Sequence, residues 1–438
     1  MNTPICDFVT RYLQENAVRF HMPGHKGAGT PENRDITEIS GADVLYHARG
    51  IIRESQSNAA ALFGTEKTLY STEGSSLAIR AMVYLTRLYA GRKPVIAAGR
   101  NAHKSFVTAA ALLEAEVDWL YPDHREDLIS CHISPDALDA YLASRDVDAV
   151  YLTSPDYLGN VADIAAMAKV CHKHGKLLLV DNAHGAYLGF LQPNRHPIAL
   201  GADLCCDSAH KTLPVLTGGA YLHIGNTAPK LFCEQAEKAM SLFASTSPSY
   251  LILQSLDNCN RYLSDGYQDK LLECIEKVSA FKEKLIAAGF ALAGEEPLKL
   301  TLAPKSYGYT GTELADRLEQ QHIICEFADP DYLTLMITPE NTPQDLEKLE
   351  KALLGVPKAE PVSGQMPFMG KPERGMSMHD AIMQPGRMLP LEQCVGKILT
   401  HPAVSCPPAI PVVVCGERIT AEAVAVMKYY GIEQLEVI

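Results

Sequence analysis

Several features that mark particular classes of protein are absent from this 438-residue sequence. It has no run of 18 or more apolar residues, and its N-terminus lacks a basic region followed by an apolar one. We therefore expect a soluble, cytoplasmic protein with no membrane partner. Internal repeats and low-complexity tracts are also missing. The length suits one large domain with one or two smaller ones.

Metal-site and nucleic-acid signals are missing too. The 12 cysteines show no CxxC pair and no Cys/His spacing typical of a metal site, so we expect reduced thiols and no metal. The formal net charge of −13 argues against a nucleic-acid partner, because binding phosphates requires a basic face. An acidic surface suits a small cationic substrate, although solvated acidic surfaces are common.

Short apolar runs alternate with helical patterns through the middle of the chain. Strands are predicted at 94–98, 117–121, 149–153, 177–180 and 203–207, with a helix at 162–174 among the intervening segments. This alternation predicts an α/β fold with a mainly parallel sheet that is covered on both faces. Ligands bind at the carboxyl ends of the strands in such sheets, so the chemistry is expected in the loops that follow them.

The pattern changes after a long predicted helix at 268–288. Strands at 297–302, 323–327 and 332–337, with helices at 312–320 and from Thr342, indicate a small α/β domain. Residues 359–374 are rich in Pro, Gly and Met, as a linker would be. We therefore predict an N-terminal segment (1–55), a large cofactor-binding domain (56–265), a small α/β domain (266–358) and a C-terminal domain (359–438).

The segment DSAHKTLP at 207–214 directly follows a predicted strand and precedes the small residues TGGA at 217–220. Lys211 would stand at a strand end beside the hydroxyl of Ser208 and the imidazole of His210. Together these groups could hold an aldehyde and a phosphate. The S-x-H-K pattern alone is equally compatible with a solvated lysine, because short motifs arise readily by chance.

One strand earlier, the apolar run at 177–180 ends in DNAHG at 181–185. A carboxylate at the end of a buried strand is costly unless it meets a cation, so we expect a positive group against Asp181. A protonated pyridine nitrogen is such a group, and its protonation would make the ring an electron sink. The alternative is an aspartate that caps a helix.

Three further loops contain candidate binding groups. STEGSS at 71–76 opens a predicted helix at 77–90. The backbone N–H groups there could bind a phosphate, or the small residues could merely cap the helix. If a phosphate binds, the side chain of Glu73 should point away from it. In RNAHKS at 100–105, His103 could stack on an aromatic cofactor ring or be polar surface. SPDYLGN at 154–160 also follows a strand, and its Pro and Gly are typical of a turn.

In this order and spacing, the segments resemble the ornithine/lysine/arginine decarboxylases of the aspartate aminotransferase fold (fold type I), particularly the shorter bacterial form without an N-terminal receiver-like wing. The matching pieces are FHMPGHKG at 20–27, DITE at 35–38, the loops described above, STSPSY at 245–250, and PPAIP at 407–411 with GE at 416–417. The resemblance covers nearly the whole chain. Its H-x-P-G-H-K-G and S-x-H-K-T pieces are specific in combination.

The resemblance implies pyridoxal 5′-phosphate as the cofactor. Lys211 would hold it as a Schiff base, Asp181 would pair with the pyridine nitrogen, and His103 would stack on the ring. His184 would lie near the ring oxygen. Small and polar residues would hold the phosphate: Gly74, Ser75, Ser76, Ser208 and His210. A second subunit completes the site in this family, so the resemblance implies at least a homodimer, with Thr246 or Ser247 reaching the neighbour's phosphate.

The implied reaction is decarboxylation of a basic L-amino acid (lysine, arginine or ornithine) to the amine and CO₂, with Lys211 or His210 protonating Cα. The cationic tail needs a carboxylate. Asp156 and Glu417 are the candidates, with ordinary turn or surface structure as the alternative. Cys406 and Ala409 depart from the aromatic residue and the glycine usual in the family, and they lie in the part of the chain that shapes the distal end of the pocket. The substrate therefore stays open.

Two alternatives also stay open. Aminotransfer or aldol-type cleavage would use the same lysine, aspartate and phosphate site. Aminotransferases usually fix the α-carboxylate with an arginine of the small domain, however, and only Arg317, inside a predicted helix, is available there. A catalytically silent homologue that regulates an active enzyme should have lost a catalytic residue, whereas Lys211, Asp181 and His103 are all present.

Overall fold

The structure is a computed structural model that describes residues 1–122, 128–406 and 410–438. The chain divides into two compact units, which are described separately. The first unit consists of residues 1–92, 148–150 and 163–270, and the second of residues 93–147, 151–162 and 271–438. No helix among the described residues is both long enough and apolar enough to cross a membrane.

The central sheet has seven strands in the order β1-β7-β6-β5-β4-β2-β3. β5 and β6 run parallel, as do β2 and β3, whereas β7 is antiparallel to both β1 and β6. The predicted mainly parallel sheet is therefore confirmed, and each of the five strands expected between residues 94 and 207 is present. The bounds are β1 Lys67–Ser71, β2 Val95–Gly99, β3 Glu116–Leu120, β4 Ala149–Thr153, β5 Leu177–Asp181, β6 Leu204–Asp207 and β7 Ala220–Ile224.

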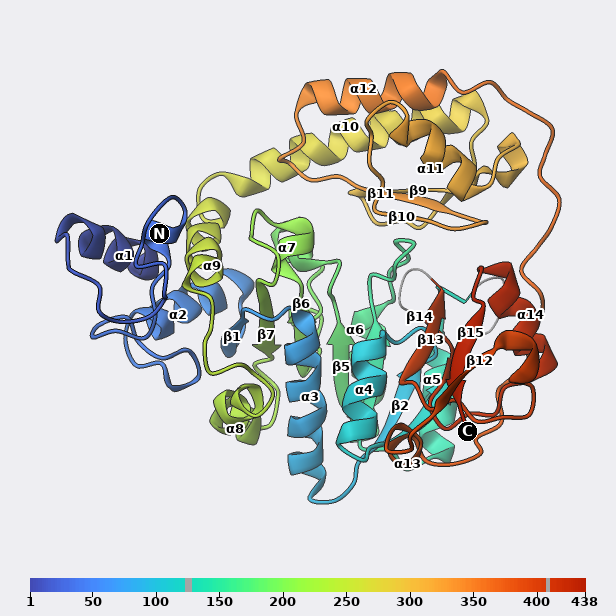
Figure 1. The fold of residues 1–438 in the computed structure, drawn as a ribbon, viewed down its shortest axis with the longest axis horizontal. Helices are drawn as coiled ribbons and strands as arrows, with labels where there is room; N and C mark the ends of the chain where they lie inside the picture. The colour runs from blue at the N-terminus through green and yellow to red at the C-terminus, as the bar shows by residue number, and fades with distance from the viewer. Residues whose placement is uncertain (123–127, 407–409) are drawn as a thin grey trace. The chain divides into compact units, whose positions relative to one another are not determined.

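In the first unit, β5, β6 and β7 lie side by side (Figure 1), and all their residues are buried. Strands buried on both faces read as continuous apolar runs, which is why the sequence pattern located β5 and β6. β7, which contains Tyr221 and His223, was not predicted from the sequence. Helix α3 (Ser75–Ala90) packs against β1, β6 and β7, and α8 (Lys230–Ser241) packs on α3. Helix α6 (Ile164–Lys173) packs against β5 and confirms the helix predicted at 162–174.

Helices α1 (Pro4–Gln14), α2 (Ile51–Phe63) and α9 (Tyr250–Leu263) pack against one another. Asp257 of α9 lies at the beginning of α1, where Oδ2 accepts hydrogen bonds from the backbone N–H groups of Ile5 and Cys6, each 3.0 Å long. Its Oδ1 accepts a bond of 2.6 Å from the hydroxyl of Ser55. The carboxylate thus satisfies N–H groups that have no partner within α1 and complements the helix dipole.

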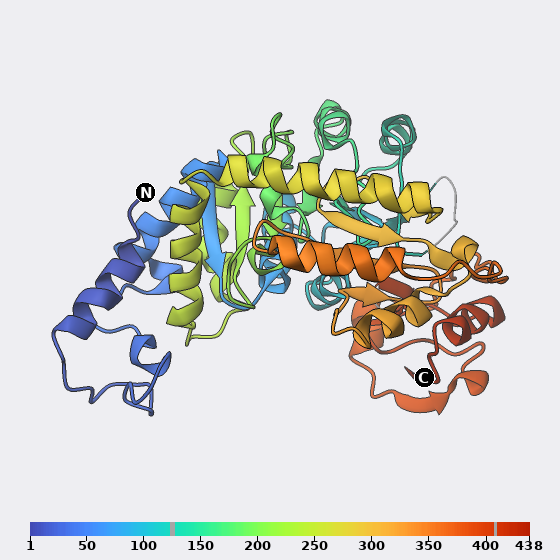
Figure 2. The ribbon, with the colours of Figure 1, turned by 90° about the horizontal axis from the view of Figure 1, so that it is seen from above.

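The second unit contains a four-stranded antiparallel sheet in the order β10-β11-β9-β8. Helices α10 and α12 lie side by side along it (Figures 1 and 2), and Lys284 and Glu350 form an ion pair of 2.7 Å between them. The bounds are α4 Lys104–Leu112, α5 Pro135–Ser144, α10 Tyr267–Ala288, β8 Leu292–Ala293, β9 Lys299–Leu302, α11 Gly311–Glu319, β10 Phe327–Ala328, β11 Leu333–Met336 and α12 Pro343–Leu354. As predicted, Thr342 is the N-cap of α12 and Pro343 its first residue.

The strand predicted at 323–327 is largely wrong. Only Phe327 and Ala328 pair with β11, opposite Thr334 and Leu333. Ile324 is 76% exposed, so the apolar residues that suggested the strand have no sheet face to bury. The short apolar run could not reveal this, because the burial of its side chains depends on the neighbouring elements.

The C-terminal part of the second unit pairs β12 (Arg387–Pro390) with β15 (Gln434–Val437) and β13 (Ala403–Cys406) with β14 (Ile410–Val414). Helices α13 (Met378–Ile382) and α14 (Ala421–Tyr429) complete it. Its buried core includes Val412, Ile419, Val426, Met427 and Leu435. Ala409, one of the two family departures, lies outside the described residues.

Candidate active site

Polar residues follow two neighbouring strands of the first unit. β5 and β6 run parallel with Asp181 opposite Cys206, so the residues that follow both strands meet at one edge of the sheet. The backbone N–H of Asn182 donates to the carbonyl of Cys206 over 3.0 Å, which joins the two strand ends. β6 then leads through Ser208 into the one-turn helix α7 (Ala209–Thr212), which contains Lys211.

The amine of Lys211 lies 3.0 Å from Nε2 of His184. Because an ammonium group can only donate, Nε2 accepts this bond and the neutral ring carries its hydrogen on Nδ1. His184 is buried and Lys211 is half-buried. The lysine is therefore held against an imidazole at the sheet edge, which differs from the alternative of a freely solvated side chain.

Asp181, the last residue of β5, is only 2% exposed. Its Oδ1 accepts hydrogen bonds from the backbone N–H of Ala183 over 3.2 Å and from the thiol of Cys206 over 3.5 Å. Burial, and next the carboxylate of Asp181, raise the pKa of Cys206 well above its ordinary value, so this thiol stays protonated and donates. A cationic ring nitrogen against Asp181 would offset the cost of burying the carboxylate.

Hydroxyl groups from two loops meet at the beginning of α3. Gly74 is the N-cap with φ of +73°, and Ser75 and Ser76 are the first helical residues. The hydroxyl of Ser208 donates to that of Ser75 over 2.8 Å. The first N–H groups of a helix have no partner within the helix and favour an anion. This end of α3 is thus suited to a phosphate.

Two glycines hold this loop and His210 in place. Nδ1 of His210 lies 3.0 Å from the carbonyl oxygen of Gly219. The oxygen can only accept, so Nδ1 carries the hydrogen and Nε2 is the basic nitrogen of the neutral ring. The carbonyl of Gly218 accepts a 2.8 Å bond from the N–H of Gly74, and a Cβ at Gly218 would lie 2.8 Å from the carbonyl oxygen of Thr72. This close approach requires glycine.

These residues fit pyridoxal 5′-phosphate. In the part of the chain that the structure describes, Oγ1 of Thr212 is buried without a hydrogen-bond partner. Thr212 follows Lys211 in the chain, and buried polar atoms normally have partners, which a bound polar group would supply. The neighbouring amine, carboxylate and hydroxyl groups match the aldehyde, ring nitrogen and phosphate of the cofactor.

Thr246 and Ser247 are exposed in the loop between α8 and α9. The carboxylate of Glu73 accepts a 2.7 Å hydrogen bond from the backbone N–H of Ser245 in the same loop. Glu73 is thus bound to this loop, in keeping with the expectation that its side chain points away from the phosphate. The assignment of Thr246 and Ser247 to a neighbouring subunit's phosphate stays a prediction.

His103 and Asp156 lie in the second unit. His103 is the half-buried N-cap of α4, and its Nδ1 accepts a bond of 3.2 Å from the backbone N–H of Ser105. Asp156 is 4% exposed and stabilises its own turn, because Oδ1 accepts bonds of 2.9 Å from the N–H groups of Gly159 and Asn160. Burial raises the pKa of Asp156, and the hydrogen bonds from Asn160 oppose this. The predicted turn is therefore present, and both functional assignments stay predictions.

Glu417, the other candidate for the substrate's cationic tail, also lies in the second unit and is buried. Its Oε2 accepts bonds from Nη2 of Arg100 over 2.8 Å and from the backbone N–H of Val414 over 2.9 Å. The guanidinium of Arg100 in turn lies 4.8 Å from the ring centroid of Trp119 and donates to the carbonyl of Val412 over 3.1 Å. Glu417 therefore joins the C-terminal strands to the loop after β2.

We expect Glu417→Ala to lower the free energy of unfolding by about 3–5 kcal/mol, because it leaves the buried Arg100 without its carboxylate. Denaturant unfolding measures this change. An unaltered unfolding midpoint together with a raised KM for a basic amino acid would contradict the structural ion pair and favour contact with the substrate. Glu373→Ala is the matched control, since its contact with Arg418 is 3.8 Å long and exposed.

The sequence did not single out four residues that meet around the end of β6: Asn182, His196, Asp207 and His223. Asp207 and Asn182 show the same signal as Asp181, since each follows an apolar run. His223 interrupts the apolar strand β7, and a polar residue there indicates a buried partner. His196 lies in a loop and has no local signal, because only the fold brings it to Asp207.

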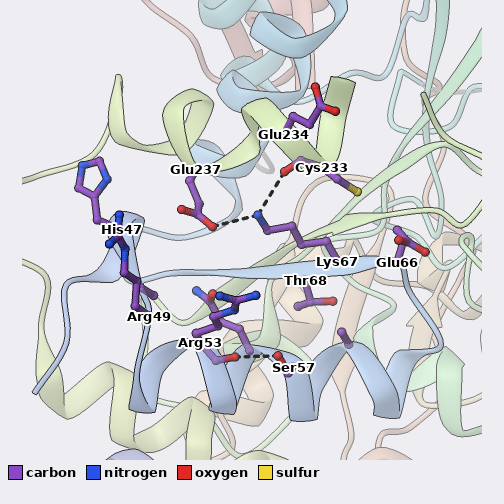
Figure 3. Close-up of a pocket in the computed structure, with 13 residues that line it drawn as sticks. His47, Arg49, Arg53, Ser57, Glu66, Lys67, Thr68, Cys233, Glu234 and Glu237 are labelled. Atoms are coloured by element: carbon purple, nitrogen blue, oxygen red, sulfur yellow. Dashed lines mark hydrogen bonds and ion pairs between the residues drawn. The ribbon is translucent and has the colours of Figure 1, made fainter. Parts of the chain in front are cut away.

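A separate cavity of about 570 Å³ opens on the first unit (Figure 3). Its wall contains charged groups of both signs, including Arg49 just before α2, Arg53 on α2, and Glu234 and Glu237 on α8. Lys67 donates to Glu237 over 2.9 Å at one side of it. None of the predicted site residues lines this cavity, so it is distinct from the candidate active site.

Comparison with known proteins supports the predicted identity. Residues 3–299 match the family described as Orn/Lys/Arg decarboxylase, major domain, and residues 367–435 match the C-terminal domain of that family. An uncharacterised protein of Bacillus subtilis and an arginine decarboxylase of Halalkalibacterium halodurans are each 29% identical to this chain, with 97% of it and 93% of the relative covered. A lysine decarboxylase structure from Francisella novicida has a TM-score of 0.82 over 100% of this chain and 81% of its own, at 17% identity.

The structural likeness confirms the predicted fold of the aspartate aminotransferase type. The match to the major domain covers more than half of the chain and confirms the predicted family. The chain therefore belongs to the Orn/Lys/Arg decarboxylase family and is a pyridoxal-phosphate-dependent decarboxylase of basic amino acids.

Proposed function

We propose that this chain removes the α-carboxyl group of L-arginine, releasing CO₂ and agmatine, with lysine and ornithine as the competing substrates. The observation that carries the proposed site is the amine of Lys211, held 3.0 Å from His184 at the sheet edge where β5 ends in the buried Asp181. Arginine is favoured because the curated relatives at 28–29% identity over 97% of the chain include two named arginine decarboxylase.

The site residues have separable roles in this proposal. Lys211 would hold the aldehyde of the cofactor, Asp181 would keep its ring nitrogen protonated, and His103 would lie on the ring. His184 would lie near the ring oxygen, and Gly74, Ser75, Ser76, Ser208 and His210 would hold the phosphate. When bound, the cofactor supplies the electron sink that accepts the electron pair left by departing CO₂.

A proton must replace the lost carboxyl group at Cα. Nζ of Lys211 or Nε2 of His210 would supply it. Nδ1 of His210 is engaged by Gly219, which leaves Nε2 as the nitrogen that gains and loses a proton. Asp156 or Glu417 would bind the cationic tail of the substrate. The same proposal includes domain boundaries at residues 55, 265 and 358. It also includes a homodimer in which Thr246 or Ser247 reaches the phosphate of the neighbouring subunit.

The direct test incubates the purified protein and its cofactor with arginine, lysine and ornithine separately. Agmatine, cadaverine and putrescine are quantified by chromatography, and CO₂ release is measured in parallel. We expect agmatine with the highest kcat/KM. Cadaverine or putrescine as the main product would overturn the choice of arginine, and a 2-oxo acid without CO₂ would overturn decarboxylation itself.

A further inference from the structure

The carboxylate of Asp207 is the centre of a fully buried polar cluster in the first unit. Its Oδ2 accepts hydrogen bonds from Nε2 of His196 over 3.0 Å and Nε2 of His223 over 3.2 Å, and its Oδ1 accepts one of 2.7 Å from Nδ2 of Asn182. All four residues are 0% exposed. A buried charge is tolerated when hydrogen bonds replace its hydration, and three N–H donors do so here.

The hydrogen positions in this cluster follow from its outer contacts. The backbone N–H of Ile198 points at Nδ1 of His196 from 3.3 Å, so Nδ1 accepts and the hydrogen of the neutral ring lies on Nε2. Burial by itself raises the pKa of Asp207, but the imidazoles of His196 and His223 lower it by more, so the carboxylate stays ionised. Burial lowers the pKa of His223 more than Asp207 raises it.

These positions argue against a metal ion, although the side chains of His196, Asp207 and His223 approach one another as metal ligands do. A metal would need the lone pair of Nε2 on His196, and the hydrogen would then have to move to Nδ1. Nδ1 already faces the N–H donor of Ile198. The geometry is that of a hydrogen-bonded network around one carboxylate.

The network connects directly to the two segments that carry the proposed site. Asn182 follows Asp181 in the chain, and its side chain donates to Asp207. Asp207 precedes Ser208, whose carbonyl accepts a 3.0 Å bond from the N–H of Lys211 and whose hydroxyl donates to Ser75. Asp207 is therefore the residue of this cluster that links the two strands. It is the last residue of β6, and its side chain is hydrogen-bonded to Asn182, which follows β5.

We propose that Asp207, supported by His196, His223 and Asn182, is a positioning residue that fixes the carboxylate of Asp181 relative to the amine of Lys211. This inference rests on the proposed site. A displacement of about 1 Å in such a group can cost on the order of 100-fold in rate. An apolar residue at 207 could not perform this function, because the N–H groups of both histidines and of Asn182 would be left buried and unpaired.

Two substitutions test the network. Asp207→Asn keeps the shape of the side chain but replaces one acceptor oxygen with an NH₂ group, which then faces another N–H donor. Asn182→Ala keeps the carboxylate and both histidines but removes the hydrogen bond that connects Asp207 to the end of β5. We expect each to lower kcat by about 10–100-fold, the range for residues that orient active-site groups, with KM within about twofold. We also expect an altered visible circular dichroism of the bound cofactor, since its two contacts would be displaced.

Hydrogen–deuterium exchange of the apoprotein supplies a measurement that does not depend on activity. We expect faster exchange in segments 181–185 and 208–212 of both variants. The matched control is Asp257→Asn, which alters another buried carboxylate of the same unit that binds Ser55 and the beginning of α1. It should lower the melting temperature while kcat, the cofactor spectrum and exchange in those two segments stay as in the wild type.

Folded Asn182→Ala protein with wild-type kcat, spectrum and exchange would overturn the proposal, even if Asp207→Asn failed to fold. Stoichiometric zinc in the purified wild type that disappears in His223→Gln would overturn it in favour of a metal site. If the wild type decarboxylates none of the three amino acids, the proposed function fails. The apoprotein exchange and the cofactor spectrum then still decide the positioning role.

Discussion

Lys211→Ala is expected to abolish the visible absorbance of the bound cofactor and to lower CO₂ release by at least about 10³-fold, because covalent catalysis depends on this single amine. The structure holds the amine 3.0 Å from His184, in a half-buried position in α7, the one-turn helix that follows β6. Absorbance of the purified variant after incubation with cofactor, followed by a single-turnover assay with arginine, measures both effects.

Lys230→Ala is the control for Lys211, because Lys230 is an exposed lysine of the same unit at the beginning of α8. It should keep the absorbance and kcat of the wild type. A Lys211→Ala protein that retained both the absorbance and the turnover would remove Lys211 from the site. If the variant kept the absorbance but lost the turnover, Lys211 would take part in the reaction without holding the cofactor.

Asp181→Ala is expected to slow kcat by roughly 10²–10³-fold, the cost of losing one preorganised electrostatic partner of a transition state. Asp181 is 2% exposed, and a buried carboxylate stabilises a protonated ring nitrogen far more than a solvated one would. The cofactor should still be held by Lys211, so its absorbance should persist. Steady-state kinetics together with a spectrum of the same sample separate the two effects.

Asp181→Asn distinguishes charge from shape at this position. The amide keeps the volume and can still accept the hydrogen bond from Ala183, but it cannot hold the ring nitrogen protonated. We expect a loss close to that of Asp181→Ala. A kcat near that of the wild type in either variant would exclude Asp181 as an electrostatic partner of the cofactor.

Local sequence patterns located five strands of the central sheet, and most clearly β4, β5 and β6, which are apolar runs bounded by polar residues. The same patterns brought Lys211, Asp181 and the loop at Gly74 to attention, because each follows or precedes such a run. The strand predicted at 323–327 was largely wrong, because its apolar run is short and the burial of such a run depends on the neighbouring elements. Cys406 and Ala409 left the substrate open, and Ala409 lies outside the described residues.

The sequence by itself determined strands β2 to β6, the residues at their ends and the family, because these depend on local periodicity and on motifs within a few residues of one another. Only the tertiary structure decided that Glu417 binds Arg100 and that His196 and His223 bind Asp207. Glu417 is 317 residues from Arg100 in the chain. Such partners leave no local signal, since a buried charge is stabilised by whichever donors the fold brings to it.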